Sequence, residues 1–121
     1  MTEGEILART CAAAAADKKA EDLVVLDMRG ISTFTDFFVI CSGTSEPQLK
    51  AIASSIREQS RETLDRHPNS ADGYPISQWI VLDYGDVIVH LFHSEKREFY
   101  GLENLWSDAK RLDLSVELPK A

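Results

Sequence analysis

Hydrophobic positions change their spacing from one segment of the chain to the next, and that spacing predicts the secondary structure. Ile6, Leu7 and Ala14 recur at helical intervals within an alanine-rich stretch, which predicts a helix near the N-terminus. The short apolar runs 23–26 and 37–41 predict two strands. Because both runs are nearly continuously apolar, we expect them in a sheet that is covered on both faces.

The segment after the second strand predicts a turn followed by a longer helix. Ser45 is expected to be the N-cap of this helix, with Gln48 three residues later completing a capping box. Pro47 falls in the first turn, where its missing N–H costs nothing. An apolar stripe then follows at helical spacing: Leu49, Ile52, Ala53, Ile56 and Leu64. Residues 67–70 are predicted to end the helix, and residues 68–75 to form a polar loop.

The clearest local pattern is a β-hairpin in the second half of the chain. Residues 76–82 and 87–92 have strand-like sequences, and residues 83–86 between them are turn formers. The elements therefore follow the order helix, two strands, helix, hairpin and helix. This order predicts an α/β fold with a mixed β-sheet flanked by helices.

A last helix is expected directly after the hairpin. His93 and Ser94 are predicted to cap it, and its apolar residues are Phe99, Leu102, Leu105 and Trp106. Gly101 is predicted to sit inside this helix, at a cost of about 1 kcal/mol relative to alanine. Residues 112–121 are weakly patterned and are predicted to form a short strand or a frayed end.

Length and composition narrow the possible classes of protein. A chain of 121 residues, 44% of them hydrophobic, is expected to form one globular domain over residues 1–110, followed by a C-terminal tail over 111–121. The net charge of −7 is a poor match for nucleic-acid binders that neutralise phosphates. No apolar run approaches the roughly 20 residues that span a membrane, and the N-terminus lacks a secretory signal. Cys11 and Cys41 are predicted to be buried, inert thiols, so we expect a soluble, cytoplasmic protein.

Polar residues that could support catalysis or metal binding have simpler interpretations. Four aspartates fall at predicted strand ends or turns, where the residue type favours turn formation over catalysis: Asp27, Asp36, Asp83 and Asp86. The segment 43–45 precedes a helix and could cradle a phosphate, but it lacks the length and the lysine of a P-loop. No Asp-x-Asp pair is present for phosphate-transfer chemistry. His90 and His93 point to opposite faces of a strand, so we expect a packed or hydrogen-bonded His90 and no metal or cofactor site.

Aromatic residues are concentrated around the predicted hairpin. Seven of the ten Phe, Trp and Tyr residues lie between Tyr74 and Trp106, where five acidic residues stand against two basic ones. Trp79 on a hairpin strand and Tyr84 at the turn are predicted to be hard to bury completely. An aromatic, acidic surface is typical of a protein-binding face, and its partner is expected to be basic.

The hairpin, residues 79–92, resembles the signature of the ribosomal silencing factor family, also called RsfS or Iojap. The similarity continues through 99–106, and it is also present upstream in Leu26-Asp27, in 35–40 and in 43–45. Together these motifs span roughly residues 5–110 in the order and spacing of the family. Gly101 departs from the polar helix former that is usual in the family at this position.

The resemblance implies a fold related to nucleotidyltransferases but without their catalytic carboxylates. It implies a non-enzymatic factor, a homodimer when free, that binds the large ribosomal subunit through the basic fourteenth ribosomal protein. Binding there would block association with the small subunit and repress translation under nutrient limitation, with no membrane or sequence-specific nucleic acid involved. By motif position the partner-binding residues would be Trp79, Asp83, Tyr84, Gly85, His90, Phe92 and Tyr100. The alternative is a nucleotide-handling enzyme, or the relic of a nucleotidyltransferase, that uses 43–45 and strand-end carboxylates such as Asp27.

Overall fold

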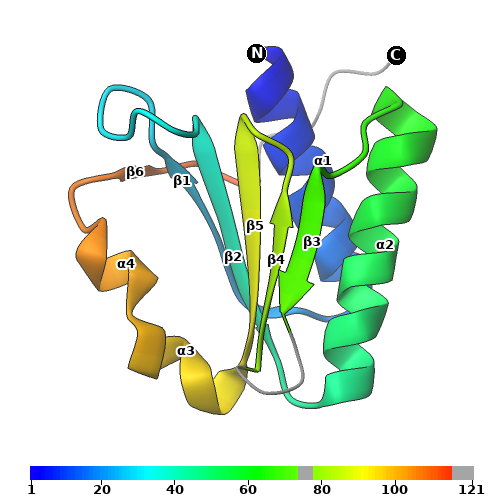
Figure 1. Cartoon of the computed structure of the whole chain (residues 1–121). Helices are drawn as coiled ribbons and strands as arrows, with labels where there is room; N and C mark the ends of the chain where they lie inside the picture. The colour runs from blue at the N-terminus through cyan, green and yellow to red at the C-terminus, as the bar shows by residue number, and fades with distance from the viewer. Residues whose placement is uncertain (74–77, 116–121) are drawn as a thin grey trace.

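A computed structural model describes residues 1–73 and 78–115, and in this part of the chain six strands form one mixed sheet in the order β3-β4-β5-β2-β1-β6 (Figure 1). The helices are α1 (Glu3–Asp17), α2 (Glu46–Leu64), α3 (Ser94–Tyr100) and α4 (Leu102–Leu105). The strands are β1 (Glu21–Asp27), β2 (Phe37–Gly43), β3 (Ser70–Gly73), β4 (Trp79–Asp83), β5 (Val87–His93) and β6 (Lys110–Arg111). Strands β2 and β5 are parallel and the other neighbours are antiparallel. The predicted α/β fold with a mixed, helix-flanked sheet is confirmed.

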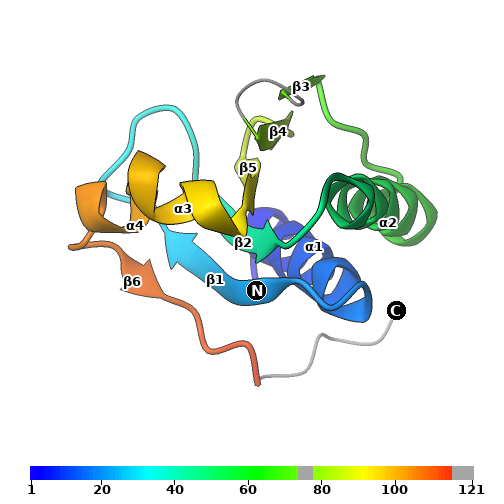
Figure 2. The ribbon, with the colours of Figure 1, turned by 90° about the horizontal axis from the view of Figure 1, so that it is seen from below.

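The two faces of the sheet are covered to different extents. Figure 2 shows α1 and α2 on one side and α3 and α4 on the other. On the first side, alternate residues of the strands pack against the two long helices, and Phe37, Val39 and Leu91 are fully buried there. Every residue of β2 is buried, as predicted for a strand covered on both faces, whereas β1 is exposed at its start.

The second face has a smaller core, beneath α3 and α4. Its buried residues are Leu26, Met28, Phe38, Ile40, Phe92 and Ala109. The short helix α4 buries none of its residues completely, and Leu102 and Trp106 are only partly buried against this core. Helix α3 contacts β5 and β2, and Figure 1 shows α4 on the side of β1 and β6, away from β3.

A largely buried arginine connects α3 and α4 to the sheet. The Arg97 side chain, 11% exposed, donates to Glu103 Oε1 in α4 at 2.7 Å and to Ser42 Oγ in β2 at 3.0 Å. The ion pair with Arg97 lowers the pKa of Glu103. Charge-assisted hydrogen bonds therefore supplement the small apolar contact of α3 and α4 with the sheet.

The predicted N-terminus of α2 is confirmed, with one change in its hydrogen bonds. Ser45 Oγ accepts from the Gln48 N–H at 3.2 Å, as an N-cap should. The Gln48 side chain accepts from the Thr44 N–H at 2.8 Å, where a capping box would use the N–H of Ser45 itself. The helix ends at Leu64, earlier than predicted, because Asp65 adopts the left-handed conformation.

Two predictions on local structure are wrong. Part of the predicted polar loop is the edge strand β3, whose four residues are all exposed and therefore carry no apolar pattern. Gly101 does not sit inside a helix: at φ 60° it ends α3 and precedes α4. Glycine adopts this left-handed conformation at little cost, so the residue separates two helices that the sequence pattern merges.

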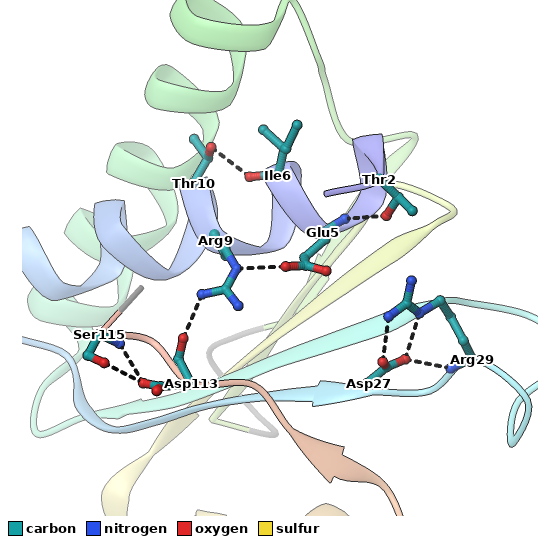
Figure 3. A network of polar contacts seen from close by, with 9 residues as sticks. All are labelled: Thr2, Glu5, Ile6, Arg9, Thr10, Asp27, Arg29, Asp113 and Ser115. Carbon is teal, nitrogen blue, oxygen red and sulfur yellow. Dashed lines mark hydrogen bonds and ion pairs between the residues drawn. The ribbon is translucent and has the colours of Figure 1, made fainter. Parts of the chain in front are cut away.

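The hairpin and the end of the described chain are both tied to the sheet. Strands β4 and β5 pair antiparallel, as predicted, although residues 76 and 77 of the predicted first strand lie outside the described residues. Strand β6 pairs with β1. Figure 3 shows how Arg9, 8% exposed, then links Glu5 Oε2 at 3.0 Å to the carbonyl of Asp113 at 2.7 Å. The domain boundary at residue 110 stays a prediction.

Candidate partner-binding face

The second sheet face also brings together side chains from β4 and β5. Trp79 lies opposite Phe92, Val81 opposite His90, and Asp83 opposite Ile88. Cross-strand partners project to the same face of a sheet, so these six side chains share it. We define the open face as these apolar and aromatic residues together with two aromatic neighbours: Phe34, Phe38, Trp79, Val81, Ile88, His90 and Phe92.

An aromatic row runs across the open face. The Trp79 ring stacks on Phe92 with a centroid distance of 5.0 Å, and the His90 ring meets Phe38 edge-on at 4.7 Å. Phe34, in the loop before β2, lies 6.1 Å from Phe38 and is 58% exposed. Phe92, His90 and Phe38 are buried and form the floor, while Trp79, Val81 and Ile88 are half-buried. The row thus ends in exposed Phe34 on one side and half-buried Trp79 on the other, both packed against a buried base.

Phe34 is a candidate contact residue that the sequence interpretation missed. It stands between Thr33 and Thr35 in a polar segment, so no strand or helix pattern selects it. The available signal was a large aromatic residue in a short segment of Ser, Thr and Asp that directly precedes a strand.

His90 is a hydrogen-bonded residue of the floor, as predicted. It is 6% exposed, and its Nδ1 accepts from the Trp79 indole N–H at 3.1 Å. His93 lies at the end of β5, and its Nδ1 accepts from the Glu95 N–H at 3.2 Å. Within residues 1–73 and 78–115, no group of three or more His, Cys, Asp or Glu side chains is arranged to hold a metal ion.

Burial of His90 predicts a pH dependence of stability. Burial lowers the pKa of His90 from 6.5 to about 4, because the charged form loses its hydration. In the unfolded chain His90 therefore binds a proton near pH 6.5, whereas in the folded chain it binds one only near pH 4. As the pH is lowered from 6.5 to about 4, we expect the protonation of His90 in the unfolded chain to reduce the free energy of unfolding by up to about 3 kcal/mol. Urea denaturation of His90→Phe at pH 7.5, 6.0 and 4.5 should show a smaller fall, and an equal fall would contradict the assignment.

Acidic residues border the open face along β3 and β4. Asp83 is half-buried and its Oδ1 accepts from the Gly85 N–H at 2.8 Å, which confirms its role in the turn. Exposed Asp72 lies opposite Val81 in the neighbouring strand. The described strands β3, β4 and β5 contain no lysine or arginine. This edge of the face therefore carries negative charge, which suits a basic partner.

The prediction that Tyr84 is hard to bury completely is wrong. Tyr84 is 3% exposed, and its hydroxyl lies 2.8 Å from Ser60 Oγ of α2. The tight turn directs the ring toward α2, on the first side of the sheet, where Ser60 is the hydrogen-bond partner of the hydroxyl. Burial there raises the pKa of Tyr84 to about 12. Its role in partner binding stays a prediction, and the structure gives it a direct role in packing.

Removing the Tyr84 hydroxyl should cost stability. Tyr84→Phe deletes one buried hydrogen bond, while Ser60 can still donate to the Arg57 carbonyl at 3.2 Å. We expect the free energy of unfolding to fall by about 1 kcal/mol, measured by urea denaturation. Because the two hydroxyls act together, Tyr84→Phe combined with Ser60→Ala should cost less than the sum of the single changes. Strictly additive losses would show that the pair is not coupled.

The remaining predicted site residues have different positions. Gly85 lies in the β4–β5 turn at φ 90°, a conformation that favours glycine. Tyr100 ends α3, and its side chain lies outside the described residues. Of the seven predicted residues, the structure brings Trp79, His90 and Phe92 together on one face, with Asp83 at the rim.

Residues that could support other chemistry are engaged in structural contacts. Asp27 bonds the Arg29 guanidinium at 2.7 Å, and Asp86 bonds Arg66 at 2.7 Å. Cys11 and Cys41 are free and buried, and burial raises the pKa of each thiol to about 12, as expected of inert thiols. In the described part of the chain, no helix is long and apolar enough to cross a membrane.

Comparison with known proteins identifies relatives that cover nearly the whole chain. The family model described as "Ribosomal silencing factor during starvation" matches residues 2–121. A ribosomal silencing factor from Bacillus subtilis is 44% identical over 114 residues, which are 94% of this chain and 95% of the relative. The chloroplastic protein Iojap of Arabidopsis thaliana is 38% identical over 103 residues, 85% of this chain and 42% of that protein.

Solved structures show the same fold. A crystal structure of a protein from Chromobacterium violaceum superposes with a TM-score of 0.81 at 25% identity, covering 96% of this chain and 95% of that one. A second crystal structure, of a protein from Bacillus halodurans, has a TM-score of 0.73 at 40% identity and covers 86% and 93% of the two chains.

Proposed function

Because the chain belongs to the RsfS family of ribosomal silencing factors, we propose that it binds the large ribosomal subunit through the open face. Docking at the fourteenth ribosomal protein then blocks association with the small subunit and represses translation when nutrients are limiting. The family description supports the link to starvation. The proposal adds the surface, the partner and the steric mechanism.

The single observation that supports this surface most strongly is the aromatic row with its buried base. Tryptophan is among the residues that dominate interface energetics, and such residues work best when held in a rigid setting. Trp79 is half-buried against Phe92, and Phe34 at the other end of the row is 58% exposed. A rigid patch with two accessible rings is suited to binding a preformed protein surface.

Charge favours a basic protein as the contact on the ribosome. Asp72 and Asp83 border the face, and the whole chain has a net charge of −7. Exposed RNA phosphates repel such a surface, whereas a basic ribosomal protein between them attracts it. The acidic charge therefore selects where on the particle the chain docks.

Blocking by occupancy requires no chemical step. A specific protein interface buries about 1,200–2,000 Å², which is enough to exclude a second macromolecule from the same surface. Silencing then depends on the concentration of the factor relative to its Kd. The proposal further holds that the free protein is a cytoplasmic homodimer, and that its fold is related to nucleotidyltransferases without their catalytic carboxylates.

Co-sedimentation with purified large subunits tests the proposed partner. We expect the protein to pellet with large subunits and not with small subunits. Added salt should weaken the interaction, since opposite charges contribute to it. Equal recovery with both subunits would contradict a specific large-subunit site.

A further inference from the structure

Among the residues that the structure describes, one buried donor of the open face has no hydrogen-bond acceptor. Within residues 1–73 and 78–115, His90 Nε2 is the buried side-chain nitrogen or oxygen that lacks a hydrogen-bond partner. His90 Nδ1 accepts from the Trp79 indole N–H, so the proton of the neutral ring is assigned to Nε2. The ring thus carries an enclosed N–H that gains nothing from its surroundings, an arrangement that disfavours the folded state.

Stability alone does not account for a histidine at this position. The ring packs against Phe38 and lies parallel to Phe92, with an interplanar angle of 9°. A phenylalanine ring can make both contacts and has no N–H to bury. What histidine supplies and phenylalanine cannot is the Nδ1 acceptor for the Trp79 indole N–H.

That acceptor determines how the Trp79 ring is held. The ring stacks on Phe92 at one face, and its N–H is anchored to His90 at 3.1 Å. Stacking on Phe92 orients the plane of the indole, and the hydrogen bond to His90 selects the direction in which its N–H points. Fixing a side chain before binding reduces the entropy that is lost when a partner docks.

We propose that His90 is a positioning residue, which holds the Trp79 indole in its binding orientation at the expense of an unsatisfied N–H of its own. The inference rests on the proposed function of the open face. It assigns His90 an action through Trp79, because the buried imidazole itself is not accessible to a partner.

The test uses the full-length protein with His90→Phe. At pH 7.5 we expect its urea midpoint to change little, because removal of the unsatisfied Nε2–H offsets the loss of the hydrogen bond from Trp79. The affinity for large subunits should fall about fivefold, close to 1 kcal/mol. The indole N–H resonance of Trp79 in the free protein should exchange faster with solvent and shift more than that of Trp106, whose ring lies 6.3 Å from Phe38.

Two further variants separate positioning from packing. His90→Asn retains an acceptor near the position of Nδ1 and should restore the Trp79 resonance and part of the affinity. In a Trp79→Phe background, which has no indole N–H at position 79, His90→Phe should have no further effect on affinity. His67→Gln, at an exposed histidine remote from the open face, is the control and should change neither readout.

The outcomes distinguish this inference from the proposed function. An unchanged Trp79 resonance and unchanged affinity in His90→Phe would overturn the positioning role. A lower urea midpoint with an unaltered Trp79 resonance would also overturn it, because the role would then be packing. The resonance is measured in the free protein, so it tests His90 even if the unmodified chain fails to bind large subunits, a result that would instead contradict the proposed function.

Discussion

Replacing Trp79 by alanine is expected to weaken binding to the large ribosomal subunit at least tenfold, about 1.4 kcal/mol or more. The substitution removes the half-buried ring that stacks on Phe92 and bonds to His90, and with it the largest anchored side chain of the open face. Affinity measured by co-sedimentation or interferometry with purified subunits checks the prediction. Circular dichroism of the variant must show that the fold is retained.

A matched control comes from an exposed apolar residue outside the open face. Leu105 in α4 is 68% exposed, and Leu105→Ala removes an exposed apolar side chain that is not part of the open face. We expect its affinity to stay within about twofold of the unmodified protein. Equal losses for Trp79→Ala and Leu105→Ala would place the interface elsewhere.

Gly73→Ala is expected to cause the largest loss of stability, about 2–4 kcal/mol. Gly73 has φ 123°, and a methyl group there would overlap the Trp79 carbonyl oxygen and lie 2.8 Å from the Ile80 Cα. These are backbone atoms of the paired strand β4, so no side chain can rotate away to make room. The strand must shift, and because it carries Trp79 the affinity for large subunits should fall as well.

Gly30→Ala separates the backbone effect from the overlap. Gly30 also has a positive φ, 81°, but nothing lies within 4 Å of the position of an added methyl group. It should cost only the conformational penalty, about 1 kcal/mol. Urea denaturation of both variants measures the difference, and a loss for Gly73→Ala no larger than that for Gly30→Ala would contradict the close approach of β3 to β4.

Regular elements with strong patterns were predictable from the sequence. The hairpin of β4 and β5 carries turn formers between two apolar strands, and Ser45 carries the chemistry of an N-cap. Strand β3 was not predictable, because its residues are all exposed and its stability comes from pairing with β4. Gly101 is ambiguous by sequence alone, since the apolar spacing of the two short helices continues across it.

The candidate site was predictable in composition and only partly in geometry. Aromatic crowding identified Trp79, but it could not show that Tyr84 turns toward Ser60 on the other side of the sheet. That direction depends on the packing of α2, a contact between residues far apart in sequence. Phe34 joins the face for the same reason, because only the fold places its loop beside Phe38.

The acidic composition takes on a more specific meaning once the face is known. A net charge of −7 argues against binding RNA through its phosphates. The proposed target is nevertheless a particle rich in RNA, and the two statements agree when the contact is a basic protein on its surface. Charge thus constrains the mode of docking and leaves the ribosome available as the partner.

The central claim is that occupancy of the open face prevents the two ribosomal subunits from joining. The most direct measurement mixes purified subunits with increasing amounts of the protein and follows the joined ribosome peak on sucrose gradients. We expect the joined peak to decline as large subunits become saturated, and to be retained at the same concentration of Trp79→Ala. An undiminished peak at saturating protein, with the protein bound to large subunits, would contradict the steric mechanism.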